Sequence, residues 1–144
     1  MERKPQTFAN HGKYDPVFHF VLSPLALVLF IGATAAAVNE GTGYAWWRAG
    51  VGFVLFLGLF KMRLYSLKVQ DRVIRLEERL RLAQVLPDRL RSRIGELTEG
   101  QLIALRFASD AELPALVDKA LAEKTAPTDI KKSIANWRPD YYRV

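Results

Sequence analysis

Side chains that could perform acid–base or metal chemistry are scarce in this chain of 144 residues. There is no cysteine, which excludes disulfides, thiolate metal ligands and cysteine nucleophiles, and the histidines are His11 and His19. His19 could serve as an axial ligand to a haem or chlorophyll in a larger assembly, but a single histidine is not a ligand set, and hydrogen bonding at an interface is the commoner role. The sequence carries no nucleophile motif, phosphate-binding glycine loop or metal-ligand spacing. It therefore predicts no catalytic residue, no metal site and no cofactor, and we expect a protein that is not an enzyme.

An uncharged apolar segment, Val17–Val38, dominates the first part of the chain. About 20 helical residues cross the ~30 Å hydrocarbon core of a bilayer, so this segment predicts a membrane span. Asp15 followed by Pro16 is a favourable helix start, because aspartate accepts the unpaired N–H groups and proline needs no donor there. A cleavable signal peptide is the competing interpretation, but the apolar stretch is too long and begins too far from the terminus.

A polar, glycine-rich turn over Asn39–Gly43 ends this span, and the chain returns through a second apolar segment, Tyr44–Phe60. Tyrosine and tryptophan favour the membrane interface, so Tyr44, Trp46 and Trp47 predict an aromatic belt beside the turn. We therefore expect a two-helix transmembrane hairpin over 16–60, preceded by an N-terminal arm over 1–15.

The net charge of +6 is concentrated after the second span, where residues 61–93 hold ten basic and four acidic side chains. The positive-inside rule then places both termini in the cytoplasm, as for a bacterial inner-membrane protein. Lys61, Arg63 and Lys68 follow the second span directly and are expected to contact anionic lipids. Nucleic acid is an improbable partner, because no aromatic stacking platform is interleaved with the basic residues.

Small residues in both spans mark places where helices can approach closely. Gly32 and Ala36, like Ala33 and Ala37, are four residues apart, and Gly52 and Gly58 lie in the second span. These positions predict contact either between the two helices of the hairpin or with another molecule.

A long helix is expected to continue from the second span, because no helix breaker precedes Pro87. Its segment 61–86 carries an apolar seam with the 4-3-4-3 spacing of a heptad repeat. Three partners remain open for this seam: the chain's own C-terminal helices, a second copy, or another subunit. The seam consists of Val69, Val73, Leu76, Leu80 and Ala83.

Residues 87–144 predict a small helical domain. Four short helices are expected, the first over 88–97. The second starts at a capping box, Thr98–Gln101, and runs to Phe107, and the third starts at a second box, Ser109–Glu112, and runs to about Lys124. The fourth runs from 126 until Pro139. The aromatic residues of the C-terminus either anchor an interface or pack on the domain. These are Trp137, Tyr141 and Tyr142. The predicted core comprises Leu102, Leu105, Leu113, Leu116, Val117, Leu121, Ile130 and Ile134.

Two stretches of this domain, Gln101–Val117 and Ile130–Val144, resemble an uncharacterised bacterial family of small two-span membrane proteins, classed as a domain of unknown function. Gln70–Arg81, Asn10-His11 and Phe18-His19-Phe20 fit the same pattern. The resemblance implies an all-α architecture with a membrane hairpin, a long second helix that extends into the cytoplasm and a small C-terminal helical domain. It implies no activity.

These observations favour a non-catalytic accessory or structural subunit of a bacterial inner-membrane complex, bound to larger membrane subunits. A self-oligomerising membrane scaffold or channel is the first alternative. A membrane tether for a cytoplasmic partner such as the ribosome is the second.

Overall fold

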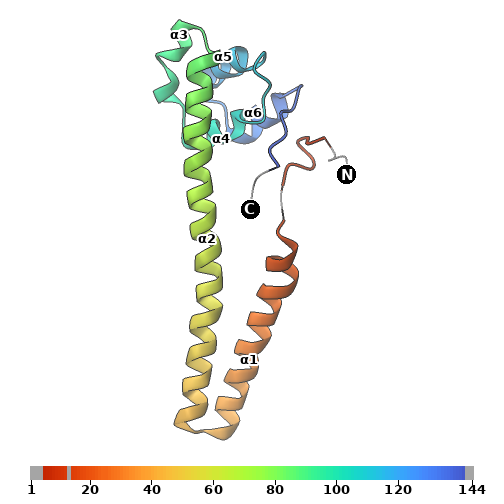
Figure 1. The fold of residues 1–144 in the computed structure, drawn as a ribbon, viewed down its shortest axis with the longest axis vertical. Coiled ribbons are helices and arrows are strands. Elements are labelled where there is room, and N and C mark those ends of the chain that lie inside the picture. The colour runs from red at the N-terminus through yellow and green to blue at the C-terminus, as the bar shows by residue number, and fades with distance from the viewer. Residues whose placement is uncertain (1–4, 13, 142–144) are drawn as a thin grey trace. The chain divides into compact units, whose positions relative to one another are not determined.

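The computed structural model describes residues 5–12 and 14–141, and over these residues it is all-α, as the sequence predicts (Figure 1). The chain forms two compact units. Residues 14–68 form the first, called here the hairpin unit, and the described parts of 1–13 and 69–143 form the C-terminal unit. The helices are α1 (Ser23–Glu40), α2 (Gly43–Val85), α3 (Asp88–Arg91), α4 (Glu99–Leu105), α5 (Leu113–Glu123) and α6 (Pro127–Ser133).

The first helix starts at the predicted Asp-Pro pair and adapts to a second proline without breaking. Asp15 Oδ1 accepts the N–H of Phe18 at 3.1 Å, as a helix cap does. The turn Phe18–Leu22 is a π-helix, and Ser23 then donates both its backbone N–H and its hydroxyl to the Phe18 carbonyl, the hydroxyl at 2.7 Å. Pro24 has no N–H to donate and its ring crowds the carbonyls before it, so the wider turn accommodates the proline.

The connection between α1 and α2 is shorter than the sequence predicts, because Asn39 and Glu40 belong to α1. Gly41 alone stops the helix: its φ of 66° lies in the left-handed region, where glycine is not strained. Thr42 then caps α2, and its hydroxyl accepts the N–H of Ala45 at 3.2 Å.

Helix α2 is one continuous helix of 43 residues, as expected from the absence of a breaker before Pro87. Two helices, Phe18–Glu40 and Gly43–Val85, are long and apolar enough to cross a membrane. Beyond Pro87 the predicted helix over 88–97 is wrong in detail, because α3 ends at Arg91 and a 3-10 turn follows over Ile94–Glu96. Gly95 weakens the helix propensity of this stretch.

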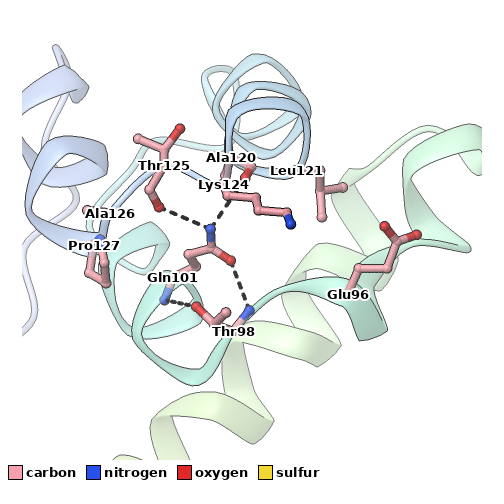
Figure 2. A pocket seen from close by; sticks show the side chains of 9 residues that line it. All are labelled: Glu96, Thr98, Gln101, Ala120, Leu121, Lys124, Thr125, Ala126 and Pro127. Carbon is pink, nitrogen blue, oxygen red and sulfur yellow. Dashed lines mark hydrogen bonds between the residues drawn. The ribbon is translucent and has the colours of Figure 1, made fainter.

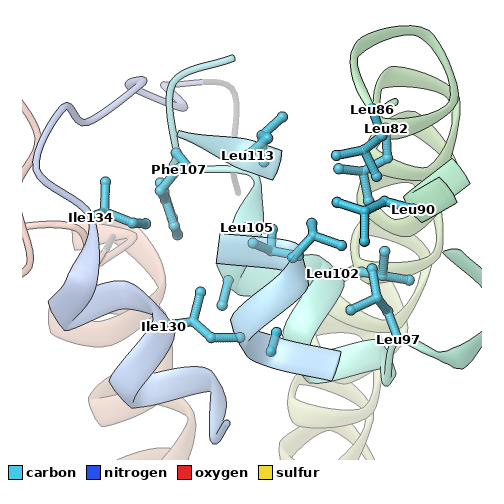
Figure 3. Close-up of a cluster of buried hydrophobic side chains, with 14 residues drawn as sticks. Leu82, Leu86, Leu90, Leu97, Leu102, Leu105, Phe107, Leu113, Ile130 and Ile134 are labelled. Atoms are coloured by element: carbon cyan, nitrogen blue, oxygen red, sulfur yellow. The ribbon is translucent and has the colours of Figure 1, made fainter. Parts of the chain in front are cut away.

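The C-terminal unit has one apolar core, to which α2 contributes Leu82, and Leu86 joins it just after the helix ends at Val85 (Figure 3). Six of the predicted core residues are buried, and Leu116 and Leu121 pack at its edge in partly buried positions. Burial of these leucines, isoleucines and one phenylalanine stabilises a unit whose individual helices are too short to form alone. The other buried members are Leu90, Leu97, Leu102, Ala104, Leu105, Phe107, Ala108, Leu113, Val117, Ala120, Ile130 and Ile134.

The predicted capping box at the start of α4 is confirmed. Gln101 N–H donates to the Thr98 hydroxyl at 3.2 Å, and Thr98 N–H donates to Gln101 Oε1 at 2.9 Å. The same glutamine amide donates to the carbonyls of Ala120 and Thr125, at 3.3 and 3.0 Å (Figure 2). One side chain therefore caps α4 and also ties it to the end of α5 and the loop that follows.

The second predicted box is wrong, since α5 begins at Leu113 and residues 109–112 form a turn. The Ser109 hydroxyl donates to the Glu112 carboxylate at 2.7 Å instead of capping a backbone N–H. That carboxylate also accepts the N–H groups of Ala135 at 2.9 Å and Asn136 at 3.2 Å. Burial opposes ionisation of Glu112, but these hydrogen bonds outweigh it and lower its pKa.

The chain leaves α6 earlier than predicted, after Ser133 rather than at Pro139, and continues extended beside residues 107–109. Arg138 N–H donates to the Phe107 carbonyl at 2.7 Å, and Ser109 N–H donates to the Asn136 carbonyl at 3.2 Å. The ring of Trp137 packs 5.1 Å from that of Phe107, centroid to centroid, which favours the extended path over another helical turn.

Gly100 provides the close approach of α4 to α6. A Cβ atom at this position would lie 2.7 Å from Pro127 Cγ, closer than real contacts allow. Although alanine favours helices, we expect Gly100→Ala to lower the free energy of unfolding by about 1–3 kcal/mol, because the proline ring cannot move aside cheaply. Chemical denaturation of the full chain in detergent would measure it. Gly95→Ala is the control, since its Cβ would meet nothing within 4 Å, and an equal loss there would contradict the packing argument.

Candidate interaction surfaces

The two long helices of the hairpin unit meet through small side chains. Ala37, Ala45 and Ala49 are buried together, and Ala33 packs against them. A Cβ at Gly52 would lie 3.6 Å from the Phe30 Cα, so this glycine also faces α1. Contact within the hairpin therefore explains part of the small-residue pattern.

The other small residues predicted to make helix contacts lie outside the contact between α1 and α2. Gly32 and Gly58 would place a Cβ with nothing of the chain within 4 Å, and Ala36 is half-buried. These two glycines are not used by the hairpin contact, and a role in contact with another molecule stays a prediction.

The end of the hairpin carries an exposed aromatic group and one ion pair. Tyr44, Trp46 and Trp47 are exposed, as residues of an interfacial belt would be. Arg48 donates to both carboxylate oxygens of Glu40 at 2.8 and 2.9 Å, and its guanidinium lies 5.2 Å from the centre of the Tyr44 ring. This pairing holds Glu40 in the last turn of α1.

The predicted lipid-contacting cations differ in their surroundings. Arg63 is largely covered, 3.8 Å from Asp15 and 5.4 Å from the centre of the Phe18 ring. Lys61 and Lys68 are exposed. His19 is exposed and its Nδ1 lies 2.8 Å from the Asp15 carbonyl oxygen. This is a hydrogen-bonding role, the commoner of the two roles considered for this histidine.

Helix α2 carries two apolar faces in its C-terminal half, of which one is buried and the other is exposed. The C-terminal unit packs on the face that holds Ile74, Glu78 and Leu82, all buried, and the buried Leu86 continues this row just beyond the helix end. The predicted seam is not packed against them: Val69, Val73, Leu76 and Leu80 are 63, 47, 60 and 58% exposed. Of the three partners left open for this seam, the chain's own C-terminal helices do not cover it, and a second copy and another subunit remain. We call Val69, Val73, Leu76, Leu80 and Ala83 the α2 stripe.

Beside the α2 stripe lies a cleft of about 730 Å³ with several charged side chains in its walls. Arg81 is one of its lining residues: it is 3.2 Å from Glu78 and 2.6 Å from Asp110, and it donates to the Ala108 carbonyl at 2.7 Å. The cleft lining consists of Ile74, Glu77, Glu78, Leu80, Arg81, Gln84, Arg106, Arg138, Pro139, Asp140 and Tyr141.

Burial alters the electrostatics of this cleft. Glu78 is only 2% exposed, and desolvation raises its pKa, while the Arg81 guanidinium opposes the rise. Arg106, also buried, lies 3.3 Å from Asp140 and 4.4 Å from the centre of the Phe107 ring. The buried charges Glu78 and Arg106 are thus paired inside the chain, and the cleft is a structural joint between α2 and the C-terminal segment.

The N-terminal arm packs on the C-terminal segment. Gln6 and Asp140 exchange two hydrogen bonds, at 2.7 Å from the Asp140 N–H and 3.1 Å to the Asp140 carbonyl. The ring of His11 lies 5.5 Å from that of Phe107 and 5.7 Å from that of Trp137. Sequence reasoning missed this contact, since no local pattern links residues more than 90 positions apart.

The same packing shows where the aromatic residues of the C-terminus lie. Trp137 is half-buried in its own unit and donates its indole N–H to the Ile134 carbonyl at 3.2 Å, so it is not an exposed anchor. Tyr141 is half-buried in the cleft lining. Tyr142, the third predicted interface residue, lies outside the described residues.

Within the part of the chain that the structure describes, no group of three or more histidine, aspartate or glutamate side chains is placed to hold a metal ion. A smaller pocket of about 370 Å³ lies beside Gln101 and Lys124 (Figure 2). The amide of Gln101 is already bound to its own chain there.

The chain belongs to the family of unknown function DUF6526, whose pattern matches residues 1–144. No match is found among curated proteins or among solved structures. Membership confirms the resemblance to an uncharacterised family seen in the sequence.

Proposed function

We propose that this protein is a non-catalytic structural subunit of a bacterial inner-membrane assembly, held by its hairpin and joined to another protein through the α2 stripe. The observation that carries the proposal is the exposure of this stripe in a chain whose C-terminal helices pack on a different face of α2. Four large apolar side chains in one row on a helix outside the apolar spans make a surface that a soluble protein usually covers.

Membrane insertion is supported by the two apolar helices and by the distribution of charge. The hairpin presents an aromatic group at its closed end, whereas Lys61 and Lys68 follow its second apolar segment. By the positive-inside rule this arrangement favours cytoplasmic termini.

The ion pairs of the C-terminal unit disfavour a tether for the ribosome or another nucleic-acid partner. Much of the basic charge of 61–93 is matched by acids of the same chain, and matched arginines contribute less to phosphate binding. The pairs are Arg75–Glu99, Arg81–Asp110, Arg89–Asp118, Arg91–Asp88 and Arg93–Glu96.

The test is purification of the full chain from its native membrane in a gentle detergent, with native mass determination and mass spectrometry of what co-migrates. We expect an assembly heavier than one chain. The variant Leu76→Lys should lose it, because a charge then interrupts the exposed stripe. Larger membrane proteins in near-stoichiometric amount identify an accessory subunit, and this chain alone identifies a scaffold. A wild-type chain that migrates alone as a monomer overturns the proposal.

A further inference from the structure

We propose that the α2 stripe pairs with the same stripe of a second copy, in a parallel and in-register two-helix contact. This inference rests on the proposed function, of which it names the partner. It is argued from the spacing of the apolar residues, the charges beside them and the face left open by the C-terminal helices.

The spacing assigns each stripe residue to a heptad position. Val73 and Leu80 occupy a positions, and Val69, Leu76 and Ala83 occupy d positions. A β-branched residue at an a position together with leucine at a d position, as at Val73 and Leu76, favours a parallel coiled coil of two helices. The register therefore places Val73 against Val73 of the second copy.

The flanking charges discriminate between the two orientations. Arg72 occupies a g position and Glu77 the e position five residues later, the separation at which g and e side chains of parallel helices meet. A parallel pair thus gains two symmetric Arg72–Glu77 contacts. An antiparallel pair would instead place Arg72 against Arg79 of the second copy, twice, and like charges destabilise.

These charged residues have no competing ion pair within the described chain. Neither Arg72 nor Glu77 forms one there, although Arg75 and Arg81 on the same helix are bound to Glu99 and Asp110. The two residues that flank the stripe are thus available to a partner, while their neighbours are occupied by the C-terminal unit.

The contact is short, about two heptads, which is marginal for a coiled coil of free helices. Two hairpins inserted in one membrane with the same orientation would already hold their α2 helices parallel. The entropy lost on association is then smaller, because part of the orientational freedom is lost on insertion.

The absence of cysteine makes a direct test possible. The full chain carrying Val73→Cys would be placed in phosphatidylethanolamine–phosphatidylglycerol vesicles and oxidised, with Ala122→Cys, exposed on α5, as the control. We expect a disulfide-linked dimer from Val73→Cys at least about tenfold faster than from the control, because opposed a positions are held close. Equal rates, or a mixed disulfide between Val73→Cys and Leu80→Cys chains, would overturn the parallel register.

A second test exchanges the charges of Arg72 and Glu77. Arg72→Glu or Glu77→Arg alone should lower the association constant about tenfold, since two attractive contacts become repulsive, and the double variant should restore it. Both residues are exposed, so circular dichroism should show an unchanged helix content. A double variant as weak as the single ones overturns the pairing. In native membranes, a Val73→Cys cross-link to a different protein overturns self-pairing but leaves the proposed structural role intact.

Discussion

Leu82→Ala is expected to lower the free energy of unfolding of the C-terminal unit by about 2–5 kcal/mol. Leu82 is 0% exposed and lies in the cluster with Leu86, Leu90 and Leu102. The substitution removes apolar contacts and leaves a cavity, and the neighbouring leucines come from different segments that cannot all collapse into it. Urea denaturation of the full chain in detergent, followed by tryptophan fluorescence, would measure the loss, because Trp137 belongs to this unit whereas Trp46 and Trp47 belong to the hairpin unit.

Leu80→Ala is the matched control, because it makes the same chemical change two residues away on the same helix. Leu80 is 58% exposed, so we expect its effect on unfolding to stay within about 0.5 kcal/mol when the chain is diluted to the monomer. The same variant should weaken the dimer. A Leu80→Ala loss as large as that of Leu82→Ala would show that the stripe is covered within the chain.

These two leucines also show where prediction from sequence fails. Both faces of α2 have helical spacing, and the uninterrupted row from Val69 to Leu80 is the more regular. The buried row contains Glu78, a charged residue that breaks its apolar pattern. Only the contacts of Glu78 with Arg81 make that face suitable for burial, and Arg81 in turn depends on Asp110, which is 29 residues away in the chain.

Three of the local signals, in contrast, predict the structure correctly. The Asp15 cap, the Thr98 box and the stop at Pro87 depend on neighbouring residues only, so the sequence contains all that determines them. The prediction of the second box is wrong because the pattern Ser-x-x-Glu also suits a turn. The Glu112 carboxylate instead accepts N–H groups of residues more than 20 positions away. The docking of the arm through Gln6 had no local signal at all.

Arg81→Met is expected to destabilise the C-terminal unit by about 3–5 kcal/mol, because it leaves a buried carboxylate without its cation. Its side chain is 12% exposed, and that of Glu78 is 3% exposed. Methionine keeps most of the aliphatic volume, so the loss reports mainly on charge and hydrogen bonding. Urea denaturation of the full chain gives the value, and the double variant Arg81→Met with Glu78→Gln should recover part of it, since the buried side chain at position 78 is then uncharged.

The pH dependence separates this explanation from a simple packing defect. Desolvation raises the pKa of Glu78 above its unfolded value, so the folded chain binds the proton more tightly. Its contribution to stability therefore falls as the pH rises from the unfolded pKa through the raised folded pKa, and is constant above. Removal of Arg81 raises that pKa further, because the opposing cation is lost. The stability gap between wild type and Arg81→Met should thus be smaller in mild acid than at neutral pH, and a gap independent of pH would show that the lost contacts to Asp110 and the Ala108 carbonyl account for the whole effect.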